Sequence, residues 1–243
     1  MFENPTADDV IDAIKVVADP SRIPDYQRYF KTGPGEYGEG DVFLGATVPK
    51  TREVAREFKG LDLAEINELV RSPLHEARLC ALIILTNRYQ RSKNPAERAE
   101  LFAFYLDIAR DGFINNWDLV DTSAHKIGEY LVTSLENPMS LLAELAAEQS
   151  LWLRRVSVLF TFAYLRVGQL QPTLDIVTLH LHDAEDLMHK ACGWALREVG
   201  NRDADALRAY LTAHAREMPR TMLRYAIEKL DEPERKSWLI NSR

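Results

Sequence analysis

The segment 152-WLRRVSVLFTF-162 decides the fold, because its pattern recurs along the chain. Basic residues come first, a small residue follows, and apolar residues then recur at helical spacing. The same pattern stands in 75-HEARLCALIIL-85, 188-MHKACGWALRE-198 and 219-PRTMLRYAIEKL-230. When 115-NNWDLVDTSAHKIG-128 is placed in register, the aligned positions lie 40, 37 and 35 residues apart: Arg78, Asp118, Arg155 and Lys190. Two-helix repeats of this length are typical of HEAT-like solenoids, in which these four aligned residues would lie in one row along a groove.

Nearly every other long segment is also helical in period, and no segment shows strand-type alternation. We therefore predict an all-α fold, with residues 1–243 forming one domain of HEAT-like repeats stacked into a curved solenoid. A globular helix bundle is the less favoured alternative, because a bundle needs no fixed period. The glycine-rich segment 31-KTGPGEYGEGD-41 predicts a long hinge or edge loop, since it does not lead from a strand into a helix.

The composition is that of an ordinary folded domain, with 46% apolar and 28% charged residues. The longest apolar runs, such as CALIIL at 80–85, are far too short to span a membrane, and the acidic N-terminus lacks the features of a signal peptide. Cys80 and Cys192 each lie in an apolar helical stretch, which indicates core residues in a reducing compartment. We expect a cytoplasmic protein with no membrane partner.

The net charge of −7 argues mildly against a nucleic-acid partner, but the charge is unevenly distributed. Residues 1–149 contain 16 Lys and Arg against 25 Asp and Glu, whereas residues 150–243 contain 14 against 12. The repeat register places four basic residues on one surface, where the second helices of the pairs would line a concave groove: Arg154, Arg155, Lys190 and Arg197. An acidic total can therefore conceal a basic groove.

The register also brings aromatic and acidic residues to that groove. Asp121, Trp194 and Arg197 fall three, four and seven positions after the aligned residue of their repeats, and such offsets share one helix face. Trp117 lies four residues before Asp121 and shares its face. We predict that these residues converge with Arg155 from three successive repeats.

Each of these residues also has a purely structural interpretation. A tryptophan on a helix is more often core than ligand platform, and Asp121 could simply accept a hydrogen bond from Thr122, Ser123 or an arginine. Asn115 and Asn116 can begin the helix, and Asp118, which follows them, could belong to its N-terminal cap. Arg155 and Arg197 could be solvated charges, or could pair with Glu198 or Asp203. The histidines and cysteines show no metal-ligand spacing, and no nucleotide-binding motif is present, so we expect neither a metal nor a cofactor.

Three motifs in this order, NWDLVD (116–121), WLRR (152–155) and GWALRE (193–198), closely resemble those of the AlkD-type DNA glycosylases. The resemblance extends from about Tyr29 to the terminal YAIEKL. That family removes alkylated purines from double-stranded DNA in base excision repair. The sequence departs from its best-known members in the glycine-rich insertion at 31–41 and in Asn116, where those members can carry a second tryptophan.

The resemblance implies a role for each matching residue. Asp121 matches the catalytic aspartate, and Trp117 and Trp194 match tryptophans that pack against the deoxyribose of the lesion. Arg155 and Arg197 match arginines that hold the DNA backbone, and Tyr29 resembles a tyrosine that reaches the same site. It also implies that the lesion can stay stacked in the duplex, whereas most base-excising enzymes flip it out.

The chemistry fits these residues. An N3- or N7-alkylated purine is cationic and leaves as a neutral base, so one carboxylate that stabilises an oxocarbenium-like sugar is sufficient. We expect a monomeric DNA glycosylase whose partner is double-stranded DNA containing alkylated purines. Two alternatives remain: a non-catalytic protein that recognises DNA structure, and a HEAT-like scaffold for protein interactions.

Overall fold

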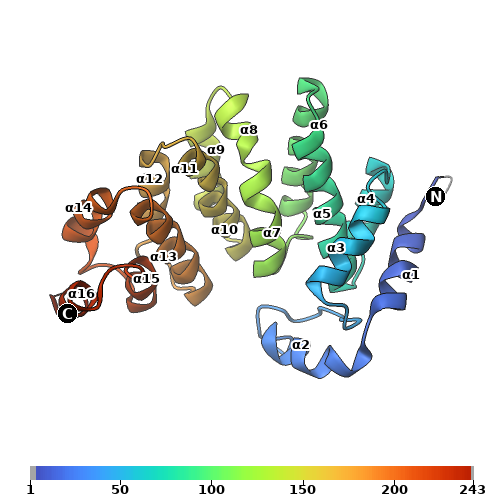
Figure 1. Ribbon diagram of the computed structural model, residues 1–243, viewed down its shortest axis with the longest axis horizontal. Coiled ribbons are helices and arrows are strands. Elements are labelled where there is room, and N and C mark those ends of the chain that lie inside the picture. Colours follow the sequence, from blue (N-terminus) through green and yellow to red (C-terminus); the bar gives the residue numbers. More distant parts are fainter. Residues whose placement is uncertain (1–3, 242–243) are drawn as a thin grey trace. The chain divides into compact units, whose positions relative to one another are not determined.

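The computed structural model describes residues 4–241, and helices dominate them throughout (Figure 1). The prediction of an all-α fold is confirmed. In this range the extended backbone pairs only as an isolated bridge between Val42 and Leu74. The chain forms two compact units whose boundary follows Ser123, inside helix α7 (Trp117–Ile127). Among the helices of the described range, none is both long and apolar enough to cross a lipid bilayer.

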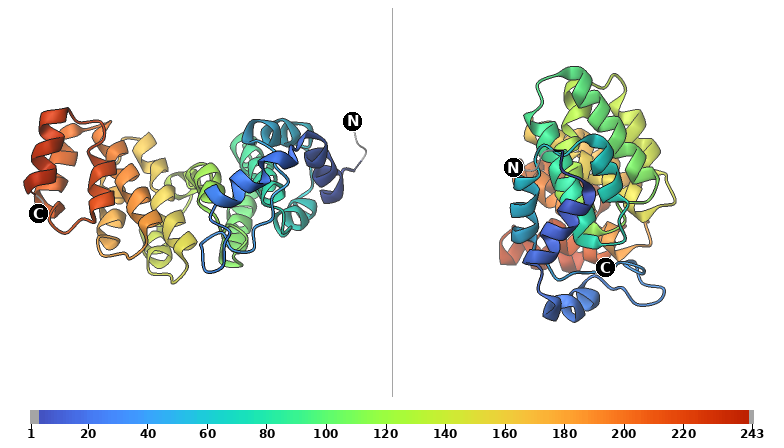
Figure 2. Two further views of the ribbon diagram at one scale, coloured as in Figure 1. Left: turned by 90° about the horizontal axis from the view of Figure 1, so that it is seen from below. Right: turned by 90° about the vertical axis from the view of Figure 1, so that its right-hand side faces the viewer.

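The first unit is built around one long central helix. Its elements are α1 (Ala7–Val17), η1 (Pro20–Arg22), α2 (Ile23–Tyr29), α3 (Val48–Glu57), α4 (Leu63–Val70), α5 (His75–Arg91), α6 (Pro95–Arg110) and the first part of α7. Helix α5 packs against α1, α3, α4 and α6, so it is buried on nearly every side. This burial explains its uninterrupted apolar run at 80–85. Helix α2 lies beyond the ends of the other helices of this unit (Figure 2).

The glycine-rich segment is a loop of turns, as predicted. The loop closes on itself where the Gly38 N–H donates to the carbonyl of Lys31 at 3.0 Å. After the loop, the Glu76 carboxylate of α5 accepts backbone N–H groups from residues 44–46 at 2.8–3.2 Å. Gly45 has a φ of +93°, and a Cβ atom there would lie 2.1 Å from the carbonyl oxygen of Asp19. Only glycine fits this close approach to Asp19. The bonds to Glu76 fix the segment between α2 and α3 to α5.

The second unit stacks its helices in series. After the end of α7 it contains α8 (Glu129–Thr133), α9 (Pro138–Ala146), α10 (Leu151–Phe160), α11 (Phe162–Arg166), α12 (Gln171–Leu179), α13 (Asp186–Gly200), α14 (Ala204–His214), α15 (Arg220–Ala226) and α16 (Glu232–Asn241). Helix α9 packs against α10, and α12 packs against α13. Helices α10, α13 and α15 pack one on the next. These three helices carry the aligned segments, so the repeat register correctly predicts their order within this unit.

The contact between α13 and α15 depends on a glycine of the GWALRE motif. A Cβ atom on Gly193 would lie 2.5 Å from both the carbonyl oxygen of Met222 and the Cβ of Tyr225. Any side chain at this position would push the two helices apart. The two helices lie side by side in Figure 2. Trp194 and Arg197 follow on the same helix, so the close contact at Gly193 also fixes the position of these two residues.

Candidate functional site

Helix α7 begins directly after Asn116. The Asn116 carbonyl accepts from the N–H of Val120, and its side-chain Oδ1 accepts from the N–H of Trp117 at 2.8 Å. The asparagine therefore begins the helix, as the sequence predicts. Trp117 and Asp121 are both half-buried and lie one turn apart on α7, so they share a helix face.

Trp117 forms an aromatic corner with the end of α2. Its ring meets that of Tyr29 edge to face at 5.8 Å and stacks on that of Phe30 at 5.5 Å, with 14° between the planes. Tyr29 is 64% exposed, whereas Phe30 is buried. The structure thus brings Tyr29 and Trp117 together, and the Tyr29 side of the corner is open to solvent.

The neighbourhood of Asp121 includes a buried tyrosine of α6. Burial raises the pKa of the Tyr105 hydroxyl, and the negative charge of Asp121 acts in the same direction. Tyr105 shares a hydrogen bond of 2.9 Å with the Ser123 hydroxyl, which also bonds the Leu119 carbonyl at 2.5 Å. The sequence suggested the Ser123 hydroxyl as a hydrogen-bond donor to Asp121. In the structure this hydroxyl bonds Tyr105 and the Leu119 carbonyl.

A buried ionic network includes Asn116 and Asp118, the chain neighbours of Trp117. His75 Nδ1 is 3.0 Å from Asp41 Oδ2, and His75 Nε2 is 2.8 Å from Asp118 Oδ2. Arg78 pairs with the other oxygen of Asp41, and Asn116 Nδ2 donates to Asp41 Oδ2 at 2.9 Å. All five side chains are buried. The sequence did not reveal the roles of His75 and Asp41, since neither residue belongs to a motif that predicts their ion pair.

This network corrects part of the predicted charge row. We expected the aligned residues Arg78 and Asp118 to line a groove, but they are only 5% and 8% exposed. Each is neutralised inside the first unit, because an unpaired buried charge would be costly. Asp118 is a structural residue, and its Oδ1 accepts from the N–H of Leu119 at 2.9 Å in the first turn of α7.

In the second unit, α13 carries Trp194 and Arg197. The half-buried Trp194 ring meets Phe162 edge to face at 4.9 Å. Arg197 forms an ion pair with Glu228, and its side chain is 20% exposed. The acids proposed from the sequence are occupied elsewhere: Glu198 pairs with Arg202 at 3.0 Å, and Asp203 caps α14.

The other three predicted basic residues have contacts within the second unit. Arg154 Nε is 2.7 Å from Asp183 Oδ2, and Arg155, only 4% exposed, donates to the carbonyl of Leu187 at 2.5 Å. Lys190 pairs with Asp186 at 2.7 Å and remains part-exposed. The sequence placed all four cations on one surface, but Arg155 is buried, and its guanidinium joins α10 to α13 while that of Arg154 joins α10 to the segment between α12 and α13. Their contact with DNA stays a prediction.

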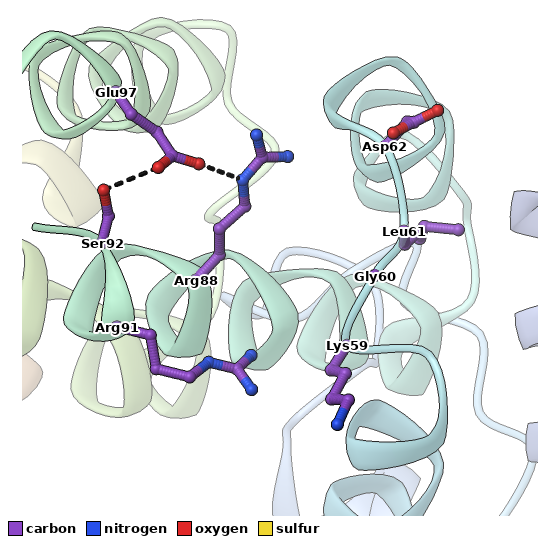
Figure 3. A pocket seen from close by; sticks show the side chains of 8 residues that line it. All are labelled: Lys59, Gly60, Leu61, Asp62, Arg88, Arg91, Ser92 and Glu97. Carbon is purple, nitrogen blue, oxygen red and sulfur yellow. Dashed lines mark hydrogen bonds and ion pairs between the residues drawn. The ribbon is translucent and has the colours of Figure 1, made fainter. Parts of the chain in front are cut away.

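A polar cavity of about 390 Å³ lies at the far end of α5 (Figure 3). Its lining residues are Lys59, Gly60, Leu61, Asp62, Arg88, Arg91, Ser92 and Glu97. Glu97 accepts from Arg88 at 2.8 Å and from Ser92 at 2.6 Å, so the acid compensates one of the cations. Helix α5 rises ~1.5 Å per residue, which puts the lining residues Arg88 and Arg91 roughly 20–24 Å along the helix from His75. It is separate from the aromatic corner.

Comparison with known proteins identifies relatives of this architecture. A sequence profile described as "DNA alkylation repair enzyme" matches residues 10–230. The structure is similar to that of a predicted DNA alkylation repair enzyme from Enterococcus faecalis, with a TM-score of 0.68 and 15% sequence identity. The match covers 88% of this chain and 97% of that one, and at this identity it shows a shared fold. Among curated proteins, none matches the chain.

Proposed function

Because the chain belongs to the family of DNA alkylation repair enzymes, we propose that it is a monofunctional DNA glycosylase. Its substrate in this proposal is double-stranded DNA that contains cationic N3- or N7-alkylated purines. The observation that carries the proposal is the half-open corner of Tyr29 and Trp117, one helical turn from the carboxylate of Asp121. An acid one helical turn from a half-buried indole that contacts an exposed tyrosine suits a reaction whose transition state is a cation.

The reaction breaks the bond between C1′ of deoxyribose and the purine nitrogen. Alkylation has already given the base a positive charge, so the bonding electrons leave with it and the base departs neutral. The sugar becomes oxocarbenium-like and is stabilised by the Asp121 carboxylate. The carboxylate also orients the attacking water and accepts its proton as the water oxygen bonds to C1′. The indole face of Trp117 adds attraction to the developing cation, worth about 0.5–2 kcal/mol.

The same reasoning gives roles to residues of the second unit. Trp194 supplies a second indole face for the deoxyribose, and Arg197 contacts a phosphate beside the lesion by exchanging Glu228 for the phosphate oxygens. Lys190 offers a further part-exposed cation. Arg154 and Arg155 can reach a phosphate only by giving up the contacts that now hold them. Binding through these groups leaves the lesion stacked and should weaken steeply with salt.

Release of 7-methylguanine from methylated duplex DNA tests the proposal. Wild-type protein should release the base, and Asp121→Asn should bind the duplex with unchanged affinity but release little, because the amide cannot balance the sugar cation. Asp175→Asn is the matched control: this exposed aspartate of α12 bonds only Gln171 in the described contacts. The control should retain wild-type activity.

Two outcomes would count against the proposal. A wild-type protein that binds duplex DNA with a steep salt dependence but releases no base would be a non-catalytic DNA-binding protein. Equal rates of release by wild type and Asp121→Asn would remove the carboxylate from the mechanism. Uracil and 8-oxoguanine are neutral bases and should be released much more slowly, since no residue of the proposed site protonates the leaving base.

A further inference from the structure

We propose that His75 is a positioning residue for this site: from α5 it joins the glycine-rich loop to the first turn of α7 and so fixes Trp117. The inference rests on the proposed function only for its kinetic consequence. Its structural content is independent, because the contacts of His75 are complete within the first unit. His75 is 2% exposed and does not itself reach the surface at which DNA would bind.

His75 joins three parts of the chain that are distant in sequence. It begins α5, its Nδ1 faces Asp41 at the end of the glycine-rich loop, and its Nε2 faces Asp118 on α7. Both ring nitrogens face carboxylate oxygens, so both must carry hydrogen, and the ring is an imidazolium. A neutral histidine would leave one carboxylate facing a lone pair in a buried site.

Three lines of contact lead from His75 to Trp117. Phe30 contacts the imidazole at 4.8 Å and stacks on the indole at 5.5 Å. Asp41 accepts from Asn116, whose Oδ1 in turn accepts the N–H of Trp117. Asp118, the other partner of the imidazole, is the chain neighbour of Trp117. Loss of the imidazolium therefore loosens Trp117 from its stacking partner, from its backbone contact and from its own helix turn at once.

The charge on His75 has a clear electrostatic cause. Burial alone would lower its pKa, but the charges and hydrogen bonds of Asp118 and Asp41 outweigh burial and raise the pKa to about 9. Two further charged groups at this place are on α5: Arg78 pairs with Asp41, and Glu76 is bonded to the N–H groups of residues 44–46. Phe30 and Phe43 cover the ring with uncharged faces. At neutral pH His75 is thus the cation that separates two buried carboxylates.

The first experiment measures the position of Trp117 and needs no enzymatic activity. Protein is labelled with 5-fluorotryptophan, and the Trp117 resonance is assigned by its absence in Trp117→Phe. In His75→Gln we expect that resonance to shift or broaden. His182→Gln makes the same substitution at a histidine that is 80% exposed, and it should leave the resonance unchanged. A Trp117 resonance that coincides in wild type and His75→Gln would overturn the inference.

The second variant adds Asp118→Asn to His75→Gln. The double variant has no uncompensated carboxylate on the α7 side, and its two amides can bond each other, so it should fold more readily and partly restore the wild-type resonance. A resonance no closer to wild type than in the single variant, with both proteins folded by circular dichroism, would contradict the electrostatic account. If only the double variant folds, its own Trp117 resonance decides the question: a position intermediate between those of native and urea-unfolded protein is required.

The third measurement separates positioning from binding. In single-turnover release of 7-methylguanine, His75→Gln should be slower by about tenfold to a hundredfold, the scale of a misplacement of about 1 Å. Its affinity for undamaged duplex should stay within about twofold, since His75 contacts no exposed cation, and a general loss of structure would reduce both. Equal rates in wild type and variant would refute the kinetic part while leaving the glycosylase proposal intact. An inactive wild type would refute the glycosylase proposal, and the fluorine resonances would still test the position of Trp117.

Discussion

Raising the pH from 6.5 to 9 should destabilise this protein through His75. The pKa of this histidine is about 9 in the folded protein against 6.5 in the unfolded chain. Between these values the unfolded chain loses the proton while the folded protein keeps it. The stabilisation is therefore complete below pH 6.5 and is lost as the pH rises through 9.

The magnitude follows from the size of the shift. One pKa unit corresponds to 1.36 kcal/mol, so the difference between 6.5 and about 9 amounts to about 3 kcal/mol. This is a sizeable part of the ~5–15 kcal/mol by which folded proteins are stable. His180, the other strongly shifted histidine, acts in the opposite direction and outside this range, because burial lowers its pKa to about 4. Its contribution is lost as the pH falls below 6.5.

The assay is urea denaturation followed by circular dichroism, at intervals between pH 6 and pH 9. Wild type and His182→Gln should lose about 3 kcal/mol of unfolding free energy over this interval relative to His75→Gln. Taking the difference between variants cancels the contributions of groups that do not contact His75, including the buried Cys80 and Cys192, whose pKa values are raised by burial. Parallel curves for wild type and His75→Gln would show that the histidine is not held as an imidazolium, and the reasoning would fail.

Three further outcomes are expected. Gly193→Ala should lower the unfolding free energy by about 1–3 kcal/mol in urea denaturation, because its Cβ would collide with α15, whereas Gly60→Ala has open space and should not be destabilising. Arg197→Ala should reduce the slope of log affinity against log salt for duplex DNA by about 0.9, one phosphate contact, while Arg71→Ala, which breaks a similar surface pair, should leave it unchanged. Trp117→Ala should slow base release more than it weakens binding, and equal losses in the two measurements would argue against a sugar-contacting role.

Local chemistry made a good part of this protein predictable. Helical periodicity identified the all-α fold, and the register placed α10, α13 and α15 in their order of stacking within the second unit. Asn116 marked the start of α7, and the spacing of four residues placed Trp117 and Asp121 on one face. These features depend on residues a few positions apart, whose geometry the helix itself dictates.

The sequence was a poor guide to which charges are buried. Arg78 and Asp118 looked like groove residues in the repeat register, and Arg154 and Arg155 looked like members of one basic surface. Each proved to be held by a partner from a distant segment, such as Asp41 for Arg78 and Asp183 for Arg154. A charge at a given helix position can face solvent or a buried counter-ion, and periodicity does not distinguish the two cases.

The sequence by itself therefore determined the helices, their register and the shared face of Trp117 and Asp121 on α7. The tertiary structure alone decided that His75 lies between Asp41 and Asp118, residues 34 and 43 positions away, and that Tyr29 meets Trp117. The physical reason is that a helix fixes which residues share a face through local geometry. The partner of a buried charge is fixed only when packing brings remote segments together and excludes the water that would otherwise solvate it.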